Sequence, residues 1–324
     1  MYREAIFPVL NGSDIANNVA RRAGSTIMTS TTMSQIVWPR AELAGCIYCT
    51  ILRDTRGVAL DQDQRFNFFP ASPFCAVTWM FEGDLYGIDH PDQMERPWTG
   101  TKVPNPSFAS PLPKPSVTWN SGEVYMIVVV FYPDAFSAMT GLDLSQFTGR
   151  PIVEEVLPSS IFGPCRNFLD DVPREGTEKS LSALYDQIEI VWASMRPDGS
   201  RPARRLKDWS GSLALRAAFG GPGRSTRQIA RRIKSWTGLS ERDLQGLGHS
   251  EQLFAKLHEA MQMGDLNWAD LATAAEFADQ AHMTRRMRQY TGFTPEQLRQ
   301  GAGNDEAFWG YRLLRQYFTK PEGQ

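Results

Sequence analysis

The stretch Ser225-Thr-Arg-Gln-Ile-Ala-Arg-Arg-Ile-Lys-Ser-Trp-Thr-Gly-Leu-Ser240 recurs in altered form 54 residues later in this chain of 324 residues. The second copy is Asp279-Gln-Ala-His-Met-Thr-Arg-Arg-Met-Arg-Gln-Tyr-Thr-Gly-Phe-Thr294. Four positions are identical in the two copies: Arg231/Arg285, Arg232/Arg286, Thr237/Thr291 and Gly238/Gly292. A repeat with this period indicates two structurally equivalent units. Because the shared residues include basic side chains expected to face outward, we expect the units to share a function as well as a fold.

Each copy is predicted to form one short helix. It begins after a residue suited to the N-cap, Ser225 or Asp279, whose side-chain oxygen can accept from free backbone N–H groups of the first turn. Glycine ends both helices, as it commonly does just after a helix C-terminus. Apolar residues follow at helical spacing in both copies: Ile229, Ile233 and Trp236, then Met283, Met287 and Tyr290. This apolar stripe must face a core.

The opposite side of each predicted helix is polar and basic. It carries Arg227, Arg231 and Lys234 in the first copy, and Ala281, Arg285 and Arg288, with Gln280 and Thr284 beside them, in the second. Such a helix fits the major groove of DNA, where Arg can bond guanine, Gln can bond adenine and Thr can contact the thymine methyl group. A solvated basic helix is the alternative for a single segment, but the repetition favours a pair of recognition helices.

A further helix is predicted before each copy. The segment Trp268 to Phe277 places Leu271, Ala274 and Ala275 on one side, has Asn267 as its cap, and turns within three residues into the second copy. This is helix-turn-helix spacing. Before the first copy, Ser212 to Phe219 gives a helix, and Gly220-Gly-Pro-Gly223 makes the turn longer and stiffer.

The segment Trp268 to Arg299, "WADLATAAEFADQAHMTRRMRQYTGFTPEQLR", resembles the second-unit signature of the AraC/XylS family of transcription regulators. The resemblance covers roughly Arg204 to Arg299 and implies two helix-turn-helix units joined by a linker helix over roughly Glu241 to Met263. It implies a sequence-specific transcription regulator, an activator or a repressor, whose two recognition helices read adjacent major grooves. Carried over residue by residue, the base-facing positions are Thr226, Arg227, Ala230, Arg231, Gln280, Ala281, Thr284 and Arg285, and those near phosphates are Lys234 and Arg288.

The chain departs from the family pattern in the second unit. Glu276 stands where a glycine usually precedes the aromatic residue, and Ala281 stands where a serine or another polar residue is common. Ala230 and Ala281 can offer only a methyl group, which suits thymine or no contact. These departures bear on sequence specificity rather than on DNA binding itself.

Charge divides the chain into two unlike parts. Residues 201–324 hold 19 Lys and Arg against 13 Asp and Glu, whereas residues 1–200 hold 15 against 23. A basic C-terminal part and an acidic N-terminal part fit a DNA reader joined to a domain of another kind. The apolar run that includes Met126 to Tyr132 is too short to span a bilayer, and no targeting segment is evident. We therefore expect a cytoplasmic protein without a membrane partner.

The first two hundred residues favour a β-rich domain. Short runs of β-branched, aromatic and aliphatic residues predict strands over Cys46–Leu52, Arg65–Phe69, Cys75–Phe81 and Val124–Phe131. The last of these is apolar on both faces and is predicted to be a central strand. Pro91 to Pro115, with seven prolines, predicts a long loop. Helices are predicted over Pro133–Met139 and Thr177–Met195.

The predicted fold class is α+β and multidomain. Residues 1–35 form a partly disordered extension, residues 36–175 a β-rich effector or dimerisation domain, residues 176–203 a helix and linker, and residues 204–324 the DNA-binding domain. By resemblance, the β-rich domain is cupin-like and senses a small molecule. The partners implied are double-stranded DNA, RNA polymerase, a small-molecule effector and a second copy of the chain. We expect no cofactor and no metal.

The cysteines and histidines bear on other functions, namely a metal or redox site and an enzyme. Cys46 and Cys49 invite a zinc or redox interpretation, but residues three apart in a strand face opposite sides, so buried structural thiols are favoured. Cys75 and Cys165 lie far off, which argues against the four-cysteine zinc site of the DNA alkyl-transfer relatives. None of the four histidines has a catalytic partner at a recognisable spacing, so no enzyme is expected. A regulator that acts only through protein partners is the other alternative, but it would give the basic faces of the two helices no function.

Overall fold

The computed structural model describes residues 33–149, 152, 159–196, 205–220, 225–263 and 267–319. Most of the predicted N-terminal extension lies outside the described residues. The predicted linker after Arg196 also lies outside them, as do the last three residues of the Gly220–Gly223 turn.

The apolar run near the middle of the chain forms β9 (Tyr125–Phe131), the central strand of a five-stranded antiparallel sheet. The strand order is β1 (Ser34–Val37), β2 (Ile47–Asp54), β9, β4 (Cys75–Glu82) and β7 (Ser107–Ala109). Ile127 of β9 lies opposite Leu52 of β2 and Trp79 of β4. The predicted central position is confirmed, because β9 is hydrogen-bonded to a neighbour along both edges.

A second antiparallel sheet has four strands in the order β3 (Phe66–Phe69), β8 (Ser116–Asn120), β5 (Leu85–Gly87) and β6 (Thr101–Lys102). The long loop predicted over Pro91 to Pro115 is wrong in part. The segment contains β6, β7 and two 3-10 helices, η2 (Pro91–Met94) and η3 (Pro97–Thr99). These strands are two or three residues long, too short to show an alternating pattern, and tertiary pairing defines them.

The remaining described elements are helices. In the N-terminal half they are η1 (Ala41–Leu43), α2 (Pro133–Thr140), η4 (Leu144–Gln146), α3 (Ser159–Glu175) and α4 (Thr177–Met195). In the C-terminal half they are α5 (Leu206–Phe219), α6 (Thr226–Thr237), α7 (Glu241–Met263), α8 (Trp268–Ala274), α9 (Gln280–Thr291), α10 (Pro295–Asn304), η6 (Glu306–Phe308) and α11 (Trp309–Thr319). The predictions for α2, α4 and α7 are confirmed. The sequence did not predict α3, because Gly163, Pro164 and Pro173 interrupt its pattern.

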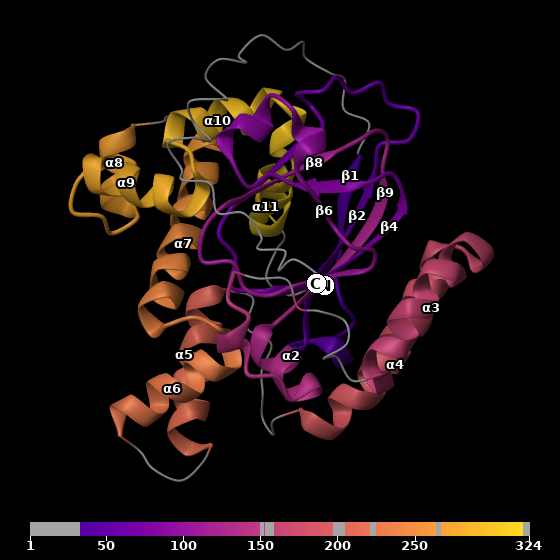
Figure 1. The fold of residues 1–324 in the computed structure, drawn as a ribbon. Helices are drawn as coiled ribbons and strands as arrows, with labels where there is room; N and C mark the ends of the chain where they lie inside the picture. The colour runs from indigo at the N-terminus through magenta and orange to yellow at the C-terminus, as the bar shows by residue number, and fades with distance from the viewer. Residues whose placement is uncertain are drawn as a thin grey trace.

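The α3–α4 hairpin covers one face of the five-stranded sheet. Figure 1 shows it on one side of the strands and α5 to α9 on the other. Trp79 of β4 contacts Phe168 of α3 edge-on, with ring centroids 4.9 Å apart. The Thr50 and Tyr185 hydroxyls are hydrogen-bonded at 2.6 Å between β2 and α4. The N-terminal core is therefore formed between this sheet and helices α2 to α4.

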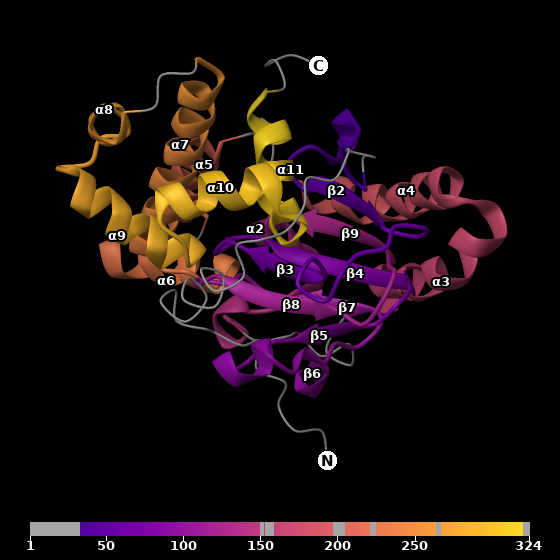
Figure 2. The ribbon, with the colours of Figure 1, turned by 90° about the horizontal axis from the view of Figure 1, so that it is seen from above.

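The four-stranded sheet packs against the C-terminal helices. Phe68 of β3 contacts both Phe293 and Phe308, with centroid distances of 5.3 Å and 5.0 Å. Figure 2 shows α10 and α11 lying close to the strands. The predicted fold class, a β-rich N-terminal region and a helical C-terminal region, is confirmed. Within the described ranges, no helix has the length and apolar character that a bilayer crossing requires.

Candidate nucleic-acid interface and the cavity behind it

Helices α6 and α9 are built alike, as the repeat predicts. Each is 12 residues long. Ser225 forms a capping box with Gln228, and the Asp279 side chain accepts from the backbone N–H of His282 at 2.6 Å. Both helices end at a glycine in the left-handed region, Gly238 at φ 71° and Gly292 at φ 83°. The predicted caps and ends are confirmed.

The equivalence extends to the corner after each helix. The Thr237 hydroxyl donates to the carbonyl of Ile233 at 2.7 Å and accepts from the backbone N–H of Leu239 at 3.2 Å. The Thr291 hydroxyl makes the same two bonds, to Met287 at 2.7 Å and from Phe293 at 3.0 Å. These two threonines are fully buried. The identical Thr-Gly pairs of the repeat therefore give the chain the same turn after α6 and after α9.

The predicted DNA-contacting residues lie on the outer surfaces of α6 and α9. Nine of the ten are exposed, and Thr284 is half-buried because its hydroxyl donates back to the carbonyl of Gln280 at 2.9 Å. Within the described part of the chain, the side chains of Arg227, Arg231, Arg285 and Arg288 take part in no hydrogen bond or ion pair. The exposed positions are Thr226, Arg227, Ala230, Arg231, Lys234, Gln280, Ala281, Arg285 and Arg288.

The two helices lie apart from each other. They belong to separate helix pairs, α5–α6 and α8–α9, placed near opposite ends of α7 (Figure 1). In the second pair, Leu271 and Ala275 are buried as expected, but Ala274 is exposed and Ala272 is buried instead. The shift follows from the end of α8 at Ala274, where the chain leaves the helix and the periodic pattern no longer applies.

The turn between α8 and α9 holds the one described non-glycine residue with positive φ. Glu276 has φ 61°, in the left-handed region where a Cβ meets the neighbouring carbonyl. This is the position at which the family pattern has glycine. The structure thus gives the physical reason for that glycine, and the chain carries a strained residue in its place.

Glu276→Gly should therefore stabilise the protein by about 0.5–1 kcal/mol. The substitution relieves a left-handed residue costing about 1–2 kcal/mol, offset in part by the greater freedom of glycine in the unfolded chain. Glu276→Ala is the matched control, since it removes the carboxylate but keeps the Cβ and should give no gain. Urea unfolding of the three proteins measures both changes. An equal gain for both variants would assign the effect to charge rather than to the backbone.

The C-terminal ends of α6 and α9 are both docked on the N-terminal region. The Thr148 hydroxyl donates to the carbonyl of Gly238 at 2.6 Å, and the backbone N–H of Ala71 donates to the carbonyl of Tyr290 at 2.7 Å. Asp134 of α2 adds a third contact, because it accepts from the Trp209 indole of α5 at 3.0 Å and pairs with Arg216. The two helix pairs are thus held against the β-rich region at separate points.

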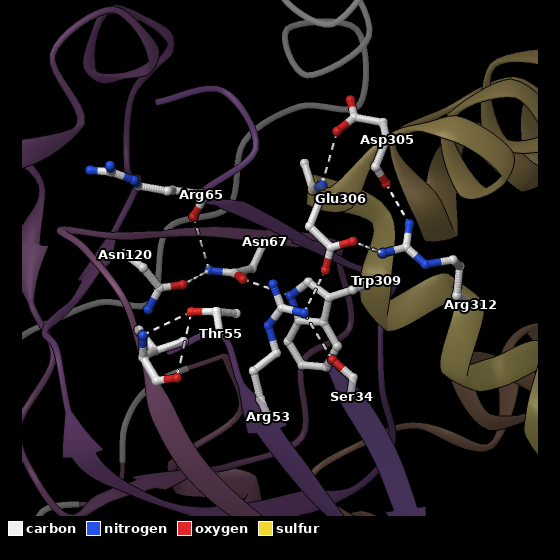
Figure 3. Close-up of polar contacts among 12 residues, drawn as sticks. Ser34, Arg53, Thr55, Arg65, Asn67, Asn120, Asp305, Glu306, Trp309 and Arg312 are labelled. Carbon is white, nitrogen blue, oxygen red and sulfur yellow. Dashed lines mark hydrogen bonds and ion pairs between the residues drawn. The ribbon is translucent and has the colours of Figure 1, made fainter. Parts of the chain in front are cut away.

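A buried ion pair joins β2 to η6. The Arg53 Nη1 atom lies 2.6 Å from Glu306 Oε1 and 2.9 Å from the Ser34 hydroxyl, as Figure 3 shows. The Arg53 side chain is only 2% exposed, and that of Glu306 is 11% exposed. Burial lowers the pKa of the Arg53 guanidinium, although the charge of Glu306 opposes this effect. Arg312 pairs with the other oxygen of Glu306, so one carboxylate connects two cations.

Trp309, the first residue of α11, extends this network. Its indole ring lies under the Arg53 guanidinium, with the guanidinium carbon 4.7 Å from the ring centroid. Its Nε1 atom donates to Asn67 Oδ1 at 2.6 Å, and the Asn67 amide in turn donates to Asn120 Oδ1 at 2.7 Å (Figure 3). The end of the chain is therefore tied to both sheets through hydrogen-bonded polar groups.

A cavity of about 300 Å³ lies between the two sheets and is bounded on one side by C-terminal helices. Its sheet walls come from alternate residues of the strands that face inward, among them Met126, Val128 and Val130 of β9. Its helical wall is formed by α5, α7, α9 and α11. The contributing residues are Leu206, Leu247, Ser250, Glu251, Phe254, Tyr290, Trp309, Gly310, Leu313 and Leu314.

The cysteines with described side chains are buried and unpaired in disulfides. Burial raises the pKa of the Cys46 and Cys75 thiols well above the ordinary value, and that of Cys49 to about 12. The Cys46 thiol lies 3.8 Å from the Met139 sulfur in the core, whereas Cys49 lines the cavity. The two sulfurs thus lie in different surroundings, although Cys46 stands just before β2 and the strand register shifts between Ile47 and Cys49.

Sequence reasoning missed the cavity and the ion pair. The cavity residues are spread over strands and helices that no local pattern connects. Arg53 follows a predicted strand and Glu306 stands far away near the end of the chain, so neither shows a signal of its partner. A charged residue at the end of an apolar strand, as in Cys-Thr-Ile-Leu-Arg53, is the one available hint that a buried charge is paired.

Several solved structures overlay on this chain at low sequence identity. Overlaid solved structures include ToxT from Vibrio cholerae O395, with 10% identity over 71% of this chain and 94% of that one, TM-score 0.30. They also include unsaturated fatty acid bound ToxT from V. cholerae strain SCE256, with 11% identity over 71% of this chain and 92% of that one, TM-score 0.31. The AraC-like transcriptional activator CuxR overlays with 11% identity, 87% and 91% coverage and TM-score 0.27.

The assignment of a helix-turn-helix segment rests on a sequence comparison. No curated protein sequence matches the chain. A family model does match it, over residues 261–300, which contain α8, its turn, α9 and the first part of α10. Over these residues the chain carries the helix-turn-helix segment of the AraC family of bacterial regulatory proteins.

Proposed function

We propose that the protein is a sequence-specific DNA-binding transcription regulator whose two recognition helices, α6 and α9, read adjacent major grooves. The observation that carries this proposal is the matched construction of the two helices. They share caps, length and exit corners, and each presents exposed arginines that no described residue neutralises. A helix front of this kind satisfies both the electrostatic and the base-reading requirements of duplex DNA. The regulator acts by binding and needs no catalytic step.

The exposed residues divide into two kinds of contact in this proposal. Thr226, Arg227, Ala230 and Arg231 of α6 face bases, as do Gln280, Ala281, Thr284 and Arg285 of α9. Lys234 and Arg288, near the C-terminal ends of their helices, face phosphates. Lys234 lies beside Asp143. Burial raises the pKa of the Asp143 carboxyl, but hydrogen bonds from Ser145 and Ser235 and the charge of Lys234 outweigh burial and lower it. The end of α6 is thus close to the N-terminal region.

Residues 204–324 form the DNA-binding domain in this proposal, and residues 36–175 the effector or dimerisation domain. The cavity between the two sheets supports control by a small molecule, because a ligand there would touch strands and recognition-unit helices at once. RNA polymerase and a second copy of the chain are the further partners that the proposal includes for an activator.

A footprint on a selected operator tests the proposal. Two recognition helices held on one chain should protect two successive major grooves on one face of the duplex, centred about 10 bp apart. Because the fronts of α6 and α9 differ in sequence, the protected stretch should be asymmetric, and roughly 20 bp long for two such turns. Arg227→Ala combined with Arg231→Ala should remove protection in one groove only. A footprint confined to one groove and unchanged by that double substitution would show that α9 alone reads DNA.

A further inference from the structure

The cavity between the sheets is apolar, with one charged group in its wall. Its described lining consists of aliphatic and aromatic side chains, with a few hydroxyl, thiol and amide groups. Among these lining residues there is no Lys, Arg, His or Asp, and Glu251 of α7 is the sole ionisable acid with a carboxylate. A cavity of this size and composition can take a small apolar molecule, and its polar groups set which functional group is accepted.

One carboxylate oxygen of Glu251 accepts a hydrogen bond, and the other does not. Its Oε2 atom accepts from the backbone N–H of Leu206 at 2.8 Å, at the start of α5. Its Oε1 atom is buried and has no hydrogen-bond partner among the described residues. The residue as a whole is only 9% exposed. A buried carboxylate oxygen without a donor is costly, so this atom marks a position at which an N–H or O–H donor would be stabilised.

The surroundings of Glu251 leave its charge incompletely compensated. Burial raises the pKa of its carboxyl to about 7, and the charge of Asp208 acts in the same direction. The Leu206 N–H and the charge of Arg205 act against this shift without cancelling it. A cation placed beside Oε1 would therefore gain an interaction that the protein alone does not supply.

We propose that the cavity binds an apolar molecule bearing one protonated amine, with the ammonium group donating to Oε1 of Glu251 and the hydrocarbon part lying between the two sheets. The proposal rests on the proposed function and names the class of its effector. A carboxylate ligand is disfavoured, because it would place a second negative charge next to Glu251 with no lining cation to offset it.

The position of the site relates a bound amine to the DNA-reading helices. Glu251 belongs to α7, which joins the two helix pairs, and the ammonium would sit where Leu206 begins α5. Tyr290, in the last turn of α9, lines the same cavity. Its hydroxyl packs so closely on Gly246 of α7 that an added Cβ there would lie 1.8 Å from it. Ligand contacts with these residues would thus reach both recognition units.

Isothermal titration of the full chain at pH 8 with octylamine, octanol and octanoate tests the proposal. The three probes share a chain and differ in the terminal group. Octylamine should bind at least about tenfold more tightly than octanol or octanoate, because a hydrogen bond to a charged group accounts for about a tenfold change or more. Binding of octylamine should weaken between pH 8 and pH 6 as Glu251 takes up a proton, while binding of octanol should not change.

Two variants on α7 separate the anchoring carboxylate from general charge. Glu251→Gln keeps an oxygen for the Leu206 N–H and removes a buried charge, so it should fold and should lose about tenfold or more of the octylamine affinity. Glu259→Gln removes an exposed carboxylate that pairs with Lys256 and should leave octylamine binding unchanged. Octanoate or octanol binding as tightly as octylamine would overturn the proposal. So would unchanged octylamine binding by Glu251→Gln, or no binding of any probe.

The footprint of the ligand-free protein is recorded in parallel. A protein that footprints DNA but ignores octylamine retains the proposed function and loses only the proposed ligand class. A protein that binds octylamine through Glu251 but leaves no footprint retains the site and loses the proposed function.

Discussion

Arg53→Ala is expected to lower the free energy of unfolding by about 3 kcal/mol, the lower end of what breaking a buried ion pair costs. The substitution leaves Glu306 nearly buried and removes the guanidinium from the Trp309 ring. It also removes a donor to Ser34. The loss stays near the lower end because Arg312 still pairs with Glu306 from the solvent side. Urea unfolding followed by tryptophan fluorescence measures the change, and Trp309 itself should report it.

Arg56→Ala is the matched control. Arg56 follows Arg53 by three residues and also pairs with a carboxylate and lies over an aromatic ring, since it contacts Asp54 and stacks on Tyr125. Its pair is exposed, with side chains 46% and 44% accessible. An exposed pair contributes about 1 kcal/mol or less. Similar losses for the two variants would mean that burial of the Arg53–Glu306 pair has no special role in joining the sheet to α11.

Arg231→Ala combined with Arg285→Ala is expected to weaken binding to the selected operator by about 2–6 kcal/mol. Each arginine, if it bonds guanine in the major groove, accounts for about 1–3 kcal/mol. The two lie on separate helices, so their losses should add. Binding to random duplex DNA should fall much less, because base contacts contribute little there. Competition titrations with operator and random DNA at one salt concentration measure both affinities.

Arg288→Ala provides the contrast within α9. As a phosphate contact it should weaken binding to operator and random DNA alike. It should also reduce the slope of log K against log salt by about one unit. If the Arg231 and Arg285 substitutions behave in the same way as Arg288→Ala, these arginines contact phosphates and the sequence is read elsewhere.

The sequence predicted those parts of the fold whose causes are local. The caps at Ser225 and Asp279 and the glycine ends at Gly238 and Gly292 need only neighbouring residues. The apolar run of β9 likewise shows its burial on both faces. The bounds of α4 follow from periodicity, whereas those of α7 were implied by the family resemblance. The candidate recognition surfaces were visible for the same reason, since a helix front is defined by spacing along one segment.

The parts that escaped prediction depend on residues far apart in the chain. Strands β6 and β7 exist because they pair with β5 and β4, not because of their own composition. The Arg53–Glu306 pair spans most of the chain. In the sequence, Glu251 looks like any other charged residue of an amphipathic helix. Its carboxylate is buried only in the folded protein, where residues distant in sequence surround it. Ala274 was misplaced because helix ends are poorly marked in sequence.

The docking of the recognition helices has a consequence for how such a protein can change over generations. The two acceptors are main-chain carbonyls, those of Gly238 and Tyr290, in the last turn or cap where a helix leaves carbonyls without internal partners. The residues proposed to face bases lie upstream, on the outer surface. If they do read DNA, substitutions that retarget the protein to another operator would leave the attachment of both helices intact. Binding preference and domain assembly can vary independently of each other.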